Sequence, residues 1–517
     1  MSTRWILTEV DEARLVAVAE LVALKIKVGD VIALSGDLGA GKTTFARALI
    51  RAVLADSEAE VPSPTYSLVQ IHPAPRLTLA HLDLYRLNDA SEAAELGIEE
   101  LLTTGAVLVE WPERMNDAGM ADRLDIYLSE GIDANCRNIE IAAQGRWTDR
   151  LTRIQDIAAF LDTHIALKSR QVRYLQGDAS ARAYARIHHA SGSRILMDWP
   201  EQPDGPPIRN GLPYSRIAHL AEGTRSFSSV QGLLAASGLR VPAIYAENHR
   251  HGLMLIEDLG DDVFAQRVAR GHDMRPMWQA ATQALVHIAA IDSDRIMRWN
   301  ASQGRIATIR DYDLGALEIE VSLLADWYWP LMTGAVMGSA VRSHFEAAWR
   351  PTLEQVLALG PKCLTLRDYH SPNLLWLEGA PQAPAMRVGL IDFQDALLGH
   401  PAFDLVSLLQ DARVDVAENL ESEMLDLYIG LSRERWPAFD EAQFRFAYAA
   451  LGAQRNTKIL GIFARLWKRD GKPQYLSHFP RLWRYLERDL AHPGMGALKA
   501  WYDAHCPVCV RRQAPNP

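Results

Sequence analysis

Cysteine and long apolar runs are scarce in this sequence of 517 residues. Only 4 cysteines occur, and no disulfide framework can be drawn from them, so we expect a reducing compartment. No stretch approaches the roughly 18 uninterrupted apolar residues that a membrane-spanning helix needs. The first residues carry charges where a signal peptide needs an apolar run. Together these absences predict a cytoplasmic protein that does not associate with membranes.

Blocks of like charge and low-complexity tracts are also missing, which argues against extended disorder. The 54 Lys and Arg residues against 64 Asp and Glu residues give a formal net charge of -10. This charge argues against a protein whose whole surface binds nucleic acid, although a local basic patch remains compatible with it. With 48% hydrophobic residues the chain can bury real cores. At roughly 100 to 200 residues per domain, the length accommodates about three or four domain-sized units.

The order of predicted elements divides the chain near residue 150. Residues 11–27 have apolar residues at helical spacing, and residues 28–36 form a short apolar strand that ends in glycine. A largely helical stretch follows at 142–171. Beyond it, residues 173–200 predict three short strands, and long amphipathic helices dominate after about residue 265. This order predicts an α/β domain followed by a small β-rich lobe and a large helical lobe.

The first candidate site is a phosphate-binding loop, GDLGAGKT, that lies between the predicted strand and helix. Its glycines allow backbone amides to approach phosphates, and the helix N-terminus adds partial positive charge. The lysine reaches the terminal phosphates, and the hydroxyl after it can hold Mg²⁺. The alternative is an ordinary glycine-rich turn. The candidate nucleotide-binding residues here are Gly36, Gly39, Gly41, Lys42, Thr43 and Thr44.

Three later segments fit around such a nucleotide. Thr65 lies in a proline-punctuated loop (62–69), Asp83 lies in a strand-like run (81–87), and Glu110 and Trp111 end a buried strand (107–114). Taken alone, Asp83 has the alternative of a surface acid, and Trp111 that of core filling. Together with the phosphate loop, these segments resemble the TsaE (YjeE) family across nearly all of residues 1–150. Its members are small bacterial ATPases needed to make threonylcarbamoyladenosine beside the tRNA anticodon.

The resemblance implies an α/β P-loop NTPase fold and a role for each matching residue. Thr65 would lie in a switch-like loop, and Trp111 would border the nucleotide. Asp83 would act at the metal, and Glu110 would act as the catalytic residue near the attacking water. The family also implies TsaB and TsaD as partners in trans, with tRNA contacted only indirectly through their complex.

A second candidate site occurs in the C-terminal half. Asp368 and Asn373 are five residues apart in LTLRDYHSPNLLWL, and Asp392 follows an apolar strand in LIDFQDA. In kinase chemistry an Asp orients the substrate hydroxyl, and a later Asn and Asp hold Mg²⁺ against the phosphates of ATP. A structural alternative exists, because Asp and Asn recur at this spacing by chance. Asp404 in GHPAFDL is interpreted as a structural acid that holds the catalytic loop.

This half resembles the aminoglycoside phosphotransferase and choline kinase superfamily, an α+β bilobal fold of the protein-kinase type. Its motifs are most similar to those of AmgK-like anomeric kinases of N-acetylmuramate and N-acetylglucosamine. They are GDASARAY, LMDWP, IEDLGD, RDYHSPNLLWL, IDFQDA and QRNTKILGIFARLWKRDGKPQYL. The resemblance implies ATP and Mg²⁺ as cofactors, an N-acetylated amino sugar as substrate and a place in peptidoglycan recycling.

Further site residues follow from the same resemblance. Gly177 and Ser180 would lie in the turn over the nucleotide phosphates, and Glu257 and Leu259 at the adenine hinge. His370 would touch the substrate, with a loop histidine satisfied by backbone groups as the alternative. The basic run of residues 455–469 either recognises the sugar or the transferred phosphate or is a solvated helix face. Its candidate substrate residues are Arg455 and Lys458.

Two departures from the kinase pattern are visible. Met197 stands where a strand lysine usually grips the α and β phosphates, and the following helix offers no glutamate to pair with such a lysine. Leu366 replaces a histidine that commonly precedes the Arg-Asp pair. These departures keep open a pseudokinase that serves as a scaffold for the ATPase. A kinase of another small alcohol, such as an aminoglycoside or choline, is the alternative enzyme.

We therefore predict a bifunctional fusion of an ATPase and a sugar kinase. The expected parts are an ATPase domain at 1–150, a helical linker at 151–172 and a kinase domain at 173–505. Within the kinase the N-lobe is expected at about 173–262 and the C-lobe at about 263–505. A tail is expected at 506–517. HCPVC, at residues 505–509, is half of a zinc or redox pattern, but no second Cys/His pair lies nearby, which favours a flexible tail.

Overall fold

The computed structural model describes residues 3–87, 92–93, 95–115, 122–166, 170–175, 182–303, 308–379 and 383–511. In this part of the chain, no helix is both long and apolar enough to cross a membrane. The chain divides into two compact units. The first comprises Met1–Glu201 and Ile244–Asp258, and the second comprises Gln202–Ala243 and Leu259–Pro517.

The first unit contains a seven-stranded sheet in the order β1-β7-β6-β2-β5-β4-β3. Strand β2 runs parallel to β5 and β6, and β4 runs parallel to β5, whereas the outer pairs are antiparallel. The strands are β1 (Arg4–Val10), β2 (Val31–Ser35), β3 (Val69–Pro73), β4 (Thr78–Asp83), β5 (Gly105–Glu110), β6 (Arg123–Glu130) and β7 (Arg137–Ala143). The carboxyl ends of the parallel strands β2, β4 and β5 therefore meet at one edge.

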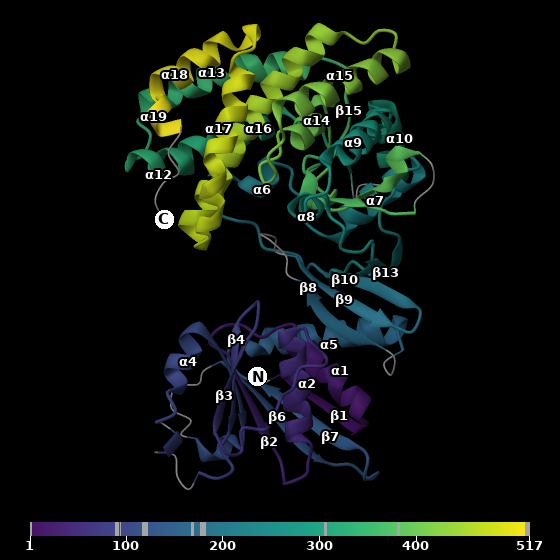
Figure 1. Cartoon of the computed structure of the whole chain (residues 1–517), viewed down its shortest axis with the longest axis vertical. Coiled ribbons are helices and arrows are strands. Elements are labelled where there is room, and N and C mark those ends of the chain that lie inside the picture. The colour runs from purple at the N-terminus through teal and green to yellow at the C-terminus, as the bar shows by residue number, and fades with distance from the viewer. Residues whose placement is uncertain are drawn as a thin grey trace. The chain divides into compact units, whose positions relative to one another are not determined.

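Helices cover both faces of this sheet. The helices are α1 (Glu12–Ala23), α2 (Lys42–Leu54), α4 (Ile98–Thr104) and α5 (Trp147–His164) (Figure 1). Successive side chains of a strand point to opposite faces. Ile32 of β2 accordingly packs in one core with residues of α1, α2 and α5, whereas Val31 packs in a second core with Ile98 of α4. Burial on both faces explains why β2 and β5 read as continuous apolar runs.

A second sheet in the same unit has five antiparallel strands in the order β13-β14-β10-β9-β8. The strands are β8 (Gln171–Leu175), β9 (Ala183–His189), β10 (Gly192–Asp198), β13 (Ile244–Asn248) and β14 (Leu253–Glu257). Val172, Ile187 and Leu196 from one face of this sheet belong to the same buried core as α1 and α5. The β-rich lobe and the P-loop domain thus share one hydrophobic core.

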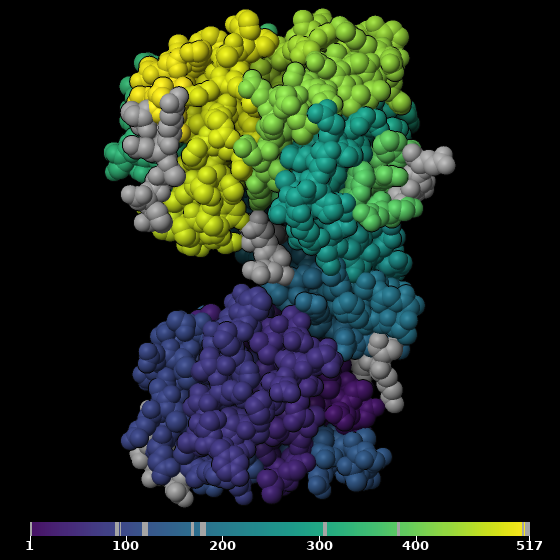
Figure 2. Space-filling model, in the orientation of Figure 1, coloured from purple at the N-terminus to yellow at the C-terminus, as the bar shows by residue number. Residues whose placement is uncertain are grey.

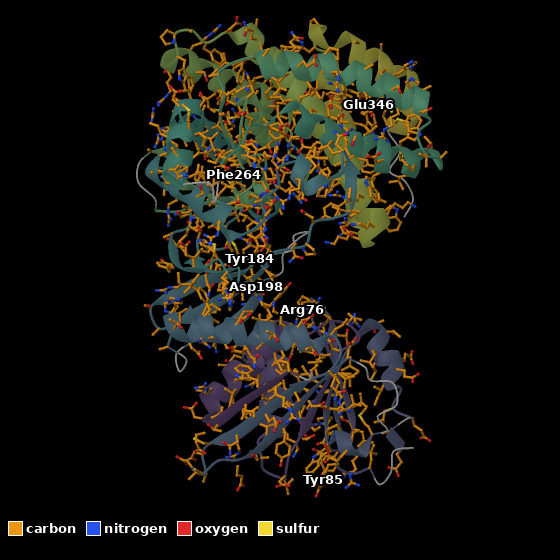
Figure 3. All side chains as sticks on the ribbon, turned by 180° about the vertical axis from the view of Figure 1, so that it is seen from behind. Arg76, Tyr85, Tyr184, Asp198, Phe264 and Glu346 are labelled. Atoms are coloured by element: carbon orange, nitrogen blue, oxygen red, sulfur yellow. The ribbon has the colours of Figure 1, made fainter. Side chains whose placement is uncertain are left out.

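Charged groups complete that shared interface, and Figure 3 labels one of them, Asp198. Asp198, at the end of β10, is 4% exposed and forms ion pairs with Lys25 and with Arg153 of α5. The Arg153 Nε donates to Asp198 Oδ1 at 2.8 Å. On the other side, the Glu20 carboxylate of α1 accepts a hydrogen bond from the backbone N–H of Val172 at 2.8 Å. Polar groups of the β-rich lobe and of the P-loop domain therefore form hydrogen bonds and ion pairs with one another.

The second unit is mainly helical. Its longer helices are α7 (Thr224–Ala236), α9 (Met274–Ala289), α10 (Ser293–Gln303), α11 (Leu314–Leu323), α13 (Ser339–Ala358), α14 (Ala402–Leu409), α15 (Glu418–Arg435), α16 (Glu441–Asp470), α17 (Phe479–Leu490) and α18 (Gly496–His505). The short helices are α6 (Tyr214–Ile217), α8 (Phe264–Ala269), α12 (Trp329–Thr333) and α19 (Val508–Arg511). In the space-filling view, the yellow surface of α17 lies beside the green surface of α15 (Figure 2), and Arg488 pairs with Glu421 between them.

Helix α16 is the longest element of this unit, with 30 residues. The Asp440 side chain caps its start by accepting from the backbone N–H of Gln443, and Gly471 ends it in the left-handed conformation at φ 64°. The helix packs against α11, α14 and α17. It therefore runs through the centre of the helical unit.

Small two-stranded sheets carry the segments between these helices. One pairs β15 (Cys363–Thr365) with β18 (Leu397–Gly399), and another pairs β16 (Leu374–Trp376) with β17 (Val388–Leu390). A third pairs β11 (Pro207–Arg209) with β12 (Leu212–Pro213). Residues 366–373 connect β15 to β16, and residues 391–396 connect β17 to β18. The pairing of β15 with β18 and of β16 with β17 brings residues 366–373 and residues 391–396 together.

We predict that replacement of Asp198 by Ala loosens the five-stranded sheet. Lys25 and Arg153 would keep their charges in a largely buried interface without the carboxylate, which costs about 3 kcal/mol. Hydrogen exchange of the β10 and β14 amides measures this loss. Glu140→Ala removes an exposed ion pair with Arg4 and serves as the control, with an expected change below about 1 kcal/mol. Equal exchange in the two variants would contradict the prediction.

Candidate functional site

The phosphate loop follows β2 and opens α2, as the sequence predicted. Gly36, Gly39 and Gly41 all have positive φ, at 136°, 84° and 101°. A Cβ on Gly36 would lie 2.1 Å from the carbonyl oxygen of Leu128, so only glycine fits there. The Lys42 ammonium donates to the carbonyl oxygens of Gly36 at 2.7 Å and Asp37 at 2.9 Å. The side chain is thus folded back over the loop where phosphates would lie.

Acidic residues from β4 and β5 meet the start of α2. The Thr43 hydroxyl donates to Glu110 Oε2 at 3.0 Å, and Glu110 Oε1 lies 3.0 Å from His81 Nε2. Asp83 stands opposite Glu110 in the parallel ladder, and its Oδ2 accepts from the Thr65 hydroxyl at 3.1 Å. The structure therefore brings together Thr43, Thr65, Asp83 and Glu110, which are far apart in the sequence. Thr44 follows on the first turn of α2.

Trp111 lies next to the phosphate-loop lysine. The Lys42 Nζ is 3.7 Å from the centre of the indole ring, and the centroids of the Tyr85 and Trp111 rings are 5.1 Å apart. Trp111 has a positive φ of 62°, which turns the chain sharply after β5. Burial lowers the pKa of Lys42, although Glu110 and other acids oppose the shift. Trp111 is thus half-buried at the loop, and it also packs against the core on the α4 face of the sheet.

In the second unit, the three residues predicted from the kinase pattern converge. Asn373 Nδ2 donates to the backbone oxygen of Asp368 at 3.0 Å and lies 3.4 Å from Asp392 Oδ2. Gln394 Nε2 donates to Asp392 Oδ1 at 3.0 Å. The Asp368 side chain is 45% exposed, so its carboxylate can meet a ligand. Burial raises the pKa of Asp368, but His370, and after it Lys458, lower the pKa by more, so the carboxyl is ionised at neutral pH.

The backbone around these residues is held in unusual conformations. Arg367 and Asp392 have positive φ, at 71° and 60°. The Asp404 carboxylate accepts from the backbone N–H groups of Leu366 at 2.6 Å and Arg367 at 2.8 Å. This geometry confirms Asp404 as the acid that holds the catalytic loop. Leu366 is 3% exposed and packs in the core, so its side chain supplies only apolar contact where a histidine is common.

The His370 ring is not satisfied by backbone groups in the way that the alternative interpretation expects. The residue is 8% exposed, and its Nδ1 is buried without a hydrogen-bond partner. Its Nε2 lies 4.0 Å from Asp368 Oδ1. Burial lowers the pKa of His370 to about 4, so the ring is neutral at pH 7. It is a neutral polar group beside the carboxylate of Asp368.

One buried carboxylate connects the catalytic loop to α11 and α16. Glu320 is 0% exposed and forms ion pairs with Arg367 and with Lys458, whose Nζ lies 2.6 Å away. Tyr312 donates to its other oxygen, as does Gln454 at 2.9 Å. Burial by itself would raise the pKa of Glu320, but the two cations outweigh burial and lower it to about 2. The carboxylate is therefore charged at neutral pH and positions Lys458 near Asp368.

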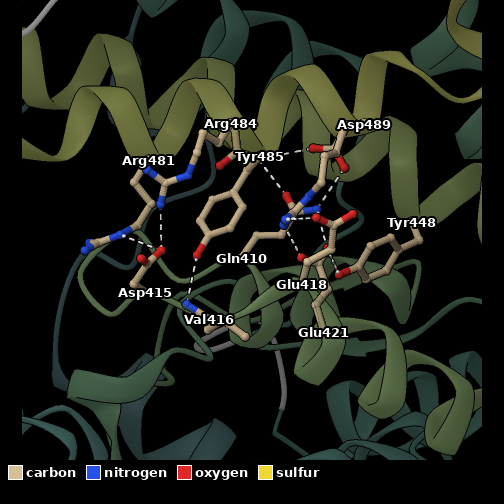
Figure 4. Close-up of polar contacts among 12 residues, drawn as sticks. Gln410, Asp415, Val416, Glu418, Glu421, Tyr448, Arg481, Arg484, Tyr485 and Asp489 are labelled. Atoms are coloured by element: carbon tan, nitrogen blue, oxygen red, sulfur yellow. Dashed lines mark hydrogen bonds and ion pairs between the residues drawn. The ribbon is translucent and has the colours of Figure 1, made fainter. Parts of the chain in front are cut away.

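The basic run on α16 is largely enclosed. Arg455 is 4% exposed, and its guanidinium donates to the backbone oxygen of Gln410 at 3.4 Å. Arg455 and Lys458 therefore do not belong to a solvated face, and only Lys468 and Arg469 are exposed. The Gln410 side chain in turn bonds Glu421 and Asp489, beside Tyr448 (Figure 4). This buried network holds α16 in place.

The remaining predicted residues are less informative. Gly177 and Ser180 lie outside the described residues. Glu257 ends β14, and the Leu259 side chain lies beside Gly389. Met197 is 1% exposed and stands between Tyr184 and Met254 in the sheet, so no cation occupies its position.

The terminal cysteine pattern receives no support as a metal site. Cys506 is buried, and burial raises its pKa to about 12, which keeps the thiol protonated. A metal ligand would have to be the thiolate. Within the described ranges, no group of three or more His, Cys, Asp or Glu side chains has the arrangement of a metal site.

Both candidate sites nevertheless offer ligands that suit Mg²⁺. This ion uses one or two carboxylates together with substrate phosphates and waters, and does not need a cage of protein side chains. Asn373 stands beside the Asp392 carboxylate in the second unit. Thr43 stands beside Glu110, with Asp83 opposite in the ladder, in the first unit. The donor sets fit a metal shared with a nucleotide.

A P-loop with acids from neighbouring strands and a kinase-type Asp/Asn/Asp group define a chain with two nucleotide-dependent modules. Residues 10–139 match the model of the threonylcarbamoyl adenosine biosynthesis protein TsaE, and residues 171–441 match that of the phosphotransferase enzyme family. The chain belongs to both families, the first in its N-terminal part and the second in its C-terminal part. The predicted fold classes of both parts are thereby confirmed.

Curated relatives agree with this division. A protein named N-acetylmuramate/N-acetylglucosamine kinase from Caulobacter vibrioides is 40% identical over 350 residues, which cover 65% of this chain and 93% of that protein. A kinase of the same name from Pseudomonas aeruginosa is 31% identical and covers 61% and 82%. The protein named tRNA threonylcarbamoyladenosine biosynthesis protein TsaE from Rickettsia conorii is 39% identical over 119 residues, which cover 23% of this chain and 67% of that protein.

Sequence reasoning missed several residues that shape the sites. His81 bonds Glu110, and it was recognisable as a polar residue two positions before Asp83 on the same strand face. Glu320 was recognisable as one of two acids in the largely apolar helix LGALEIEVSL, and it is the one of the two that is buried. Tyr214 lies near the catalytic loop only because the chain folds back there, so no local signal identifies it.

We predict that Glu320→Gln destabilises the helical unit by about 3 to 5 kcal/mol, because it leaves Arg367 and Lys458 buried without a counter-charge. Denaturant unfolding followed through the helical unit measures the loss. Because the pKa of Glu320 falls from 4.5 to about 2 on folding, its contribution is complete above pH 4.5 and disappears as the pH falls toward 2. The difference from wild type should shrink in that range.

The control is Glu354→Gln on α13, whose side chain is 55% exposed. We expect a change within about 0.5 kcal/mol. A Glu320→Gln protein as stable as this control at pH 7 would show that the buried carboxylate does not hold the loop.

Proposed function

We propose that this protein is bifunctional. Its N-terminal part hydrolyses ATP in support of tRNA threonylcarbamoyladenosine modification, and its C-terminal part phosphorylates the anomeric hydroxyl of N-acetylmuramate or N-acetylglucosamine with ATP. The names of the relatives support both activities. The observation that carries the kinase is the meeting of Asp368, Asn373 and Asp392. The contact of Thr43 with Glu110 behind an intact phosphate loop carries the ATPase.

In the ATPase, Lys42 would exchange its two loop carbonyls for the β and γ phosphates of ATP. Glu110 would orient the attacking water, with His81 fixing its carboxylate. The Thr65 hydroxyl, which bonds Asp83, would couple the conformation of the loop at 62–69 to the nucleotide. Trp111 would cover the nucleotide beside Lys42. Each of these roles uses a contact already present among the described residues.

In the kinase, Asp368 would accept the proton of the sugar hydroxyl as that oxygen bonds to the γ phosphorus of ATP and the bond from phosphorus to ADP breaks. Lys458, held by Glu320, would stabilise the negative charge on the phosphoryl group in transfer. Arg455 and His370 would line the site in which the phosphoryl group is transferred. Catalysis would consist mainly of positioning and charge neutralisation.

Mg²⁺ would be held by Asn373 and Asp392 in the kinase, and by Thr43 with Asp83 in the ATPase. The bound ion would neutralise phosphate charge at each site. The metal, the nucleotide and the partner proteins TsaB and TsaD belong to this proposal. tRNA would be reached only through the complex with those proteins.

The alternatives have less support. Cationic substrates such as aminoglycosides or choline call for an acidic site, whereas Arg455, Lys458 and Arg465 line one face of α16. A pseudokinase would not need the assembled Asp368, Asn373 and Asp392. We therefore propose that both parts of the chain are enzymes.

We predict that Lys42→Ala lowers sugar-independent ATP hydrolysis by at least about 100-fold, because the loop loses its phosphate-binding cation. Sugar phosphorylation should remain near wild type. Asp392→Ala is the reciprocal control, which should lose sugar phosphorylation and keep ATP hydrolysis. Colorimetric phosphate release and labelled sugar phosphate measure the two reactions. Loss of both reactions in a well-folded Lys42→Ala protein would contradict two separate sites.

We predict that the sugar product is a 1-phosphate. Such a glycosyl phosphate is acid-labile and has no reducing end, whereas a 6-phosphate remains a reducing sugar. Mild acid treatment, a reducing-sugar test and phosphorus NMR distinguish the two products. Methyl glycosides should be inert, because they have no anomeric hydroxyl for Asp368 to orient. Efficient phosphorylation of a methyl glycoside would refute the anomeric assignment and leave a kinase of another hydroxyl.

A further inference from the structure

Helix α16 carries three cations on one face, and two of them, Arg455 and Lys458, lie near the catalytic loop. Arg455, Lys458 and Arg465 are three and seven residues apart, which places them on one face of a helix with 3.6 residues per turn. Asp368 lies within the electrostatic influence of Arg455 and Lys458. Arg465 lies two turns beyond Lys458, or about 10 Å along the helix axis.

The first two cations have partners in the protein. Lys458 is paired with Glu320 at 2.6 Å. Arg455 donates to the Gln410 carbonyl and lies within the influence of the Asp411 carboxylate. Lys458 and Arg455 therefore hold the catalytic loop and α16 together, or neutralise the charge of the phosphoryl group during transfer.

Arg465 has no such partner. Its guanidinium faces the ring of Tyr214 at 5.6 Å, and its Nε is buried without a hydrogen bond. Among the described residues no carboxylate lies within ion-pair distance of it. The nearby carboxylate of Asp470 is bound by Arg469 at 2.7 Å and 3.0 Å. A half-buried guanidinium without a counter-ion is costly, and an anionic ligand group would remove that cost.

Tyr214 connects this cation to the site of phosphoryl transfer. Burial raises the pKa of Tyr214, and the negative charge of Asp368 adds to the shift while the positive charge of Arg465 opposes it. Arg367, next to Asp368, donates to the Ala218 carbonyl at 3.0 Å, at the end of the short helix α6 that Tyr214 begins. The residue that packs against Arg465 therefore belongs to a helix that contacts the catalytic loop.

The two sugars of the proposed function differ at one place that matters here. N-acetylmuramate carries a lactyl ether on its third carbon, and this arm ends in a carboxylate that N-acetylglucosamine lacks. With the anomeric hydroxyl at Asp368, the carboxylate projects from a ring carbon two positions from the anomeric carbon, at the end of a short arm. Arginine binds carboxylates through two parallel hydrogen bonds.

We propose that Arg465 binds the lactyl carboxylate of N-acetylmuramate and sets the preference for this sugar over N-acetylglucosamine. The assignment rests on the proposed sugar-kinase function. Tyr214 positions the guanidinium by packing against its flat face. Arg465 acts in substrate selection and not in the chemical step, because the carboxylate is remote from the anomeric oxygen.

The test compares kcat/KM for the two sugars in the full-length protein. Arg465→Gln should lower kcat/KM for N-acetylmuramate roughly 10- to 100-fold, mainly through KM, as expected for loss of a hydrogen-bonded charge pair. The value for N-acetylglucosamine should change less than about threefold. Arg465→Lys, which keeps the charge but not the fork, should fall between wild type and Arg465→Gln. Lys468→Gln, at an exposed position three residues further on, should leave the ratio unchanged.

A substrate change tests the same contact without altering the protein. The methyl ester of N-acetylmuramate should be a poor substrate for wild type, by the same factor, and Arg465→Gln should not distinguish ester from acid. Equal use of ester and acid by wild type would overturn the assignment, as would equal losses for both sugars in Arg465→Gln. A wild-type protein inactive on both sugars would overturn the proposed function and this assignment with it.

Discussion

The buried carboxylate of Glu320 is the constraint on which the second site depends. It bonds at once to the catalytic loop through Arg367, to α16 through Lys458 and Gln454, and to Tyr312. A fully buried charge is tolerated only when its partners satisfy it completely. The positions of these elements are therefore coupled, and the loop that holds Asp368 cannot move independently of α16.

The first site uses a smaller version of the same device. Glu110 is 2% exposed at the end of β5 and bonds Thr43 of the phosphate loop and His81 of the neighbouring strand. Parallel pairing sets Asp83 beside it. In both sites a buried acid fixes a cationic or hydroxyl group near the place where phosphates would bind, so that little reorganisation is needed when a ligand arrives.

The five-stranded sheet is packed against the P-loop domain. The face of the sheet that carries Leu196 shares a core with α1 and α5, and Asp198 pairs with Lys25 and Arg153 across that contact. On the same strand, the side chain of Met197 lies on the opposite face, because successive residues alternate. Arg186 shares the face of Met197, but Asp258 binds its guanidinium at 2.6 Å. The missing strand lysine is thus not simply replaced by a neighbour on the next strand.

The sequence by itself determined both modules, because their signals are local. The glycines and lysine of the phosphate loop follow one another, and Asp368, Asn373 and Asp392 lie within 25 residues. Their spacing, together with the motifs around them, predicts their roles. Only the tertiary structure decided which residues surround them. Glu320, Tyr214 and Arg465 lie far from Asp368 along the chain, and the charge balance that leaves Arg465 without a partner arises only when helices and loops pack and exclude water.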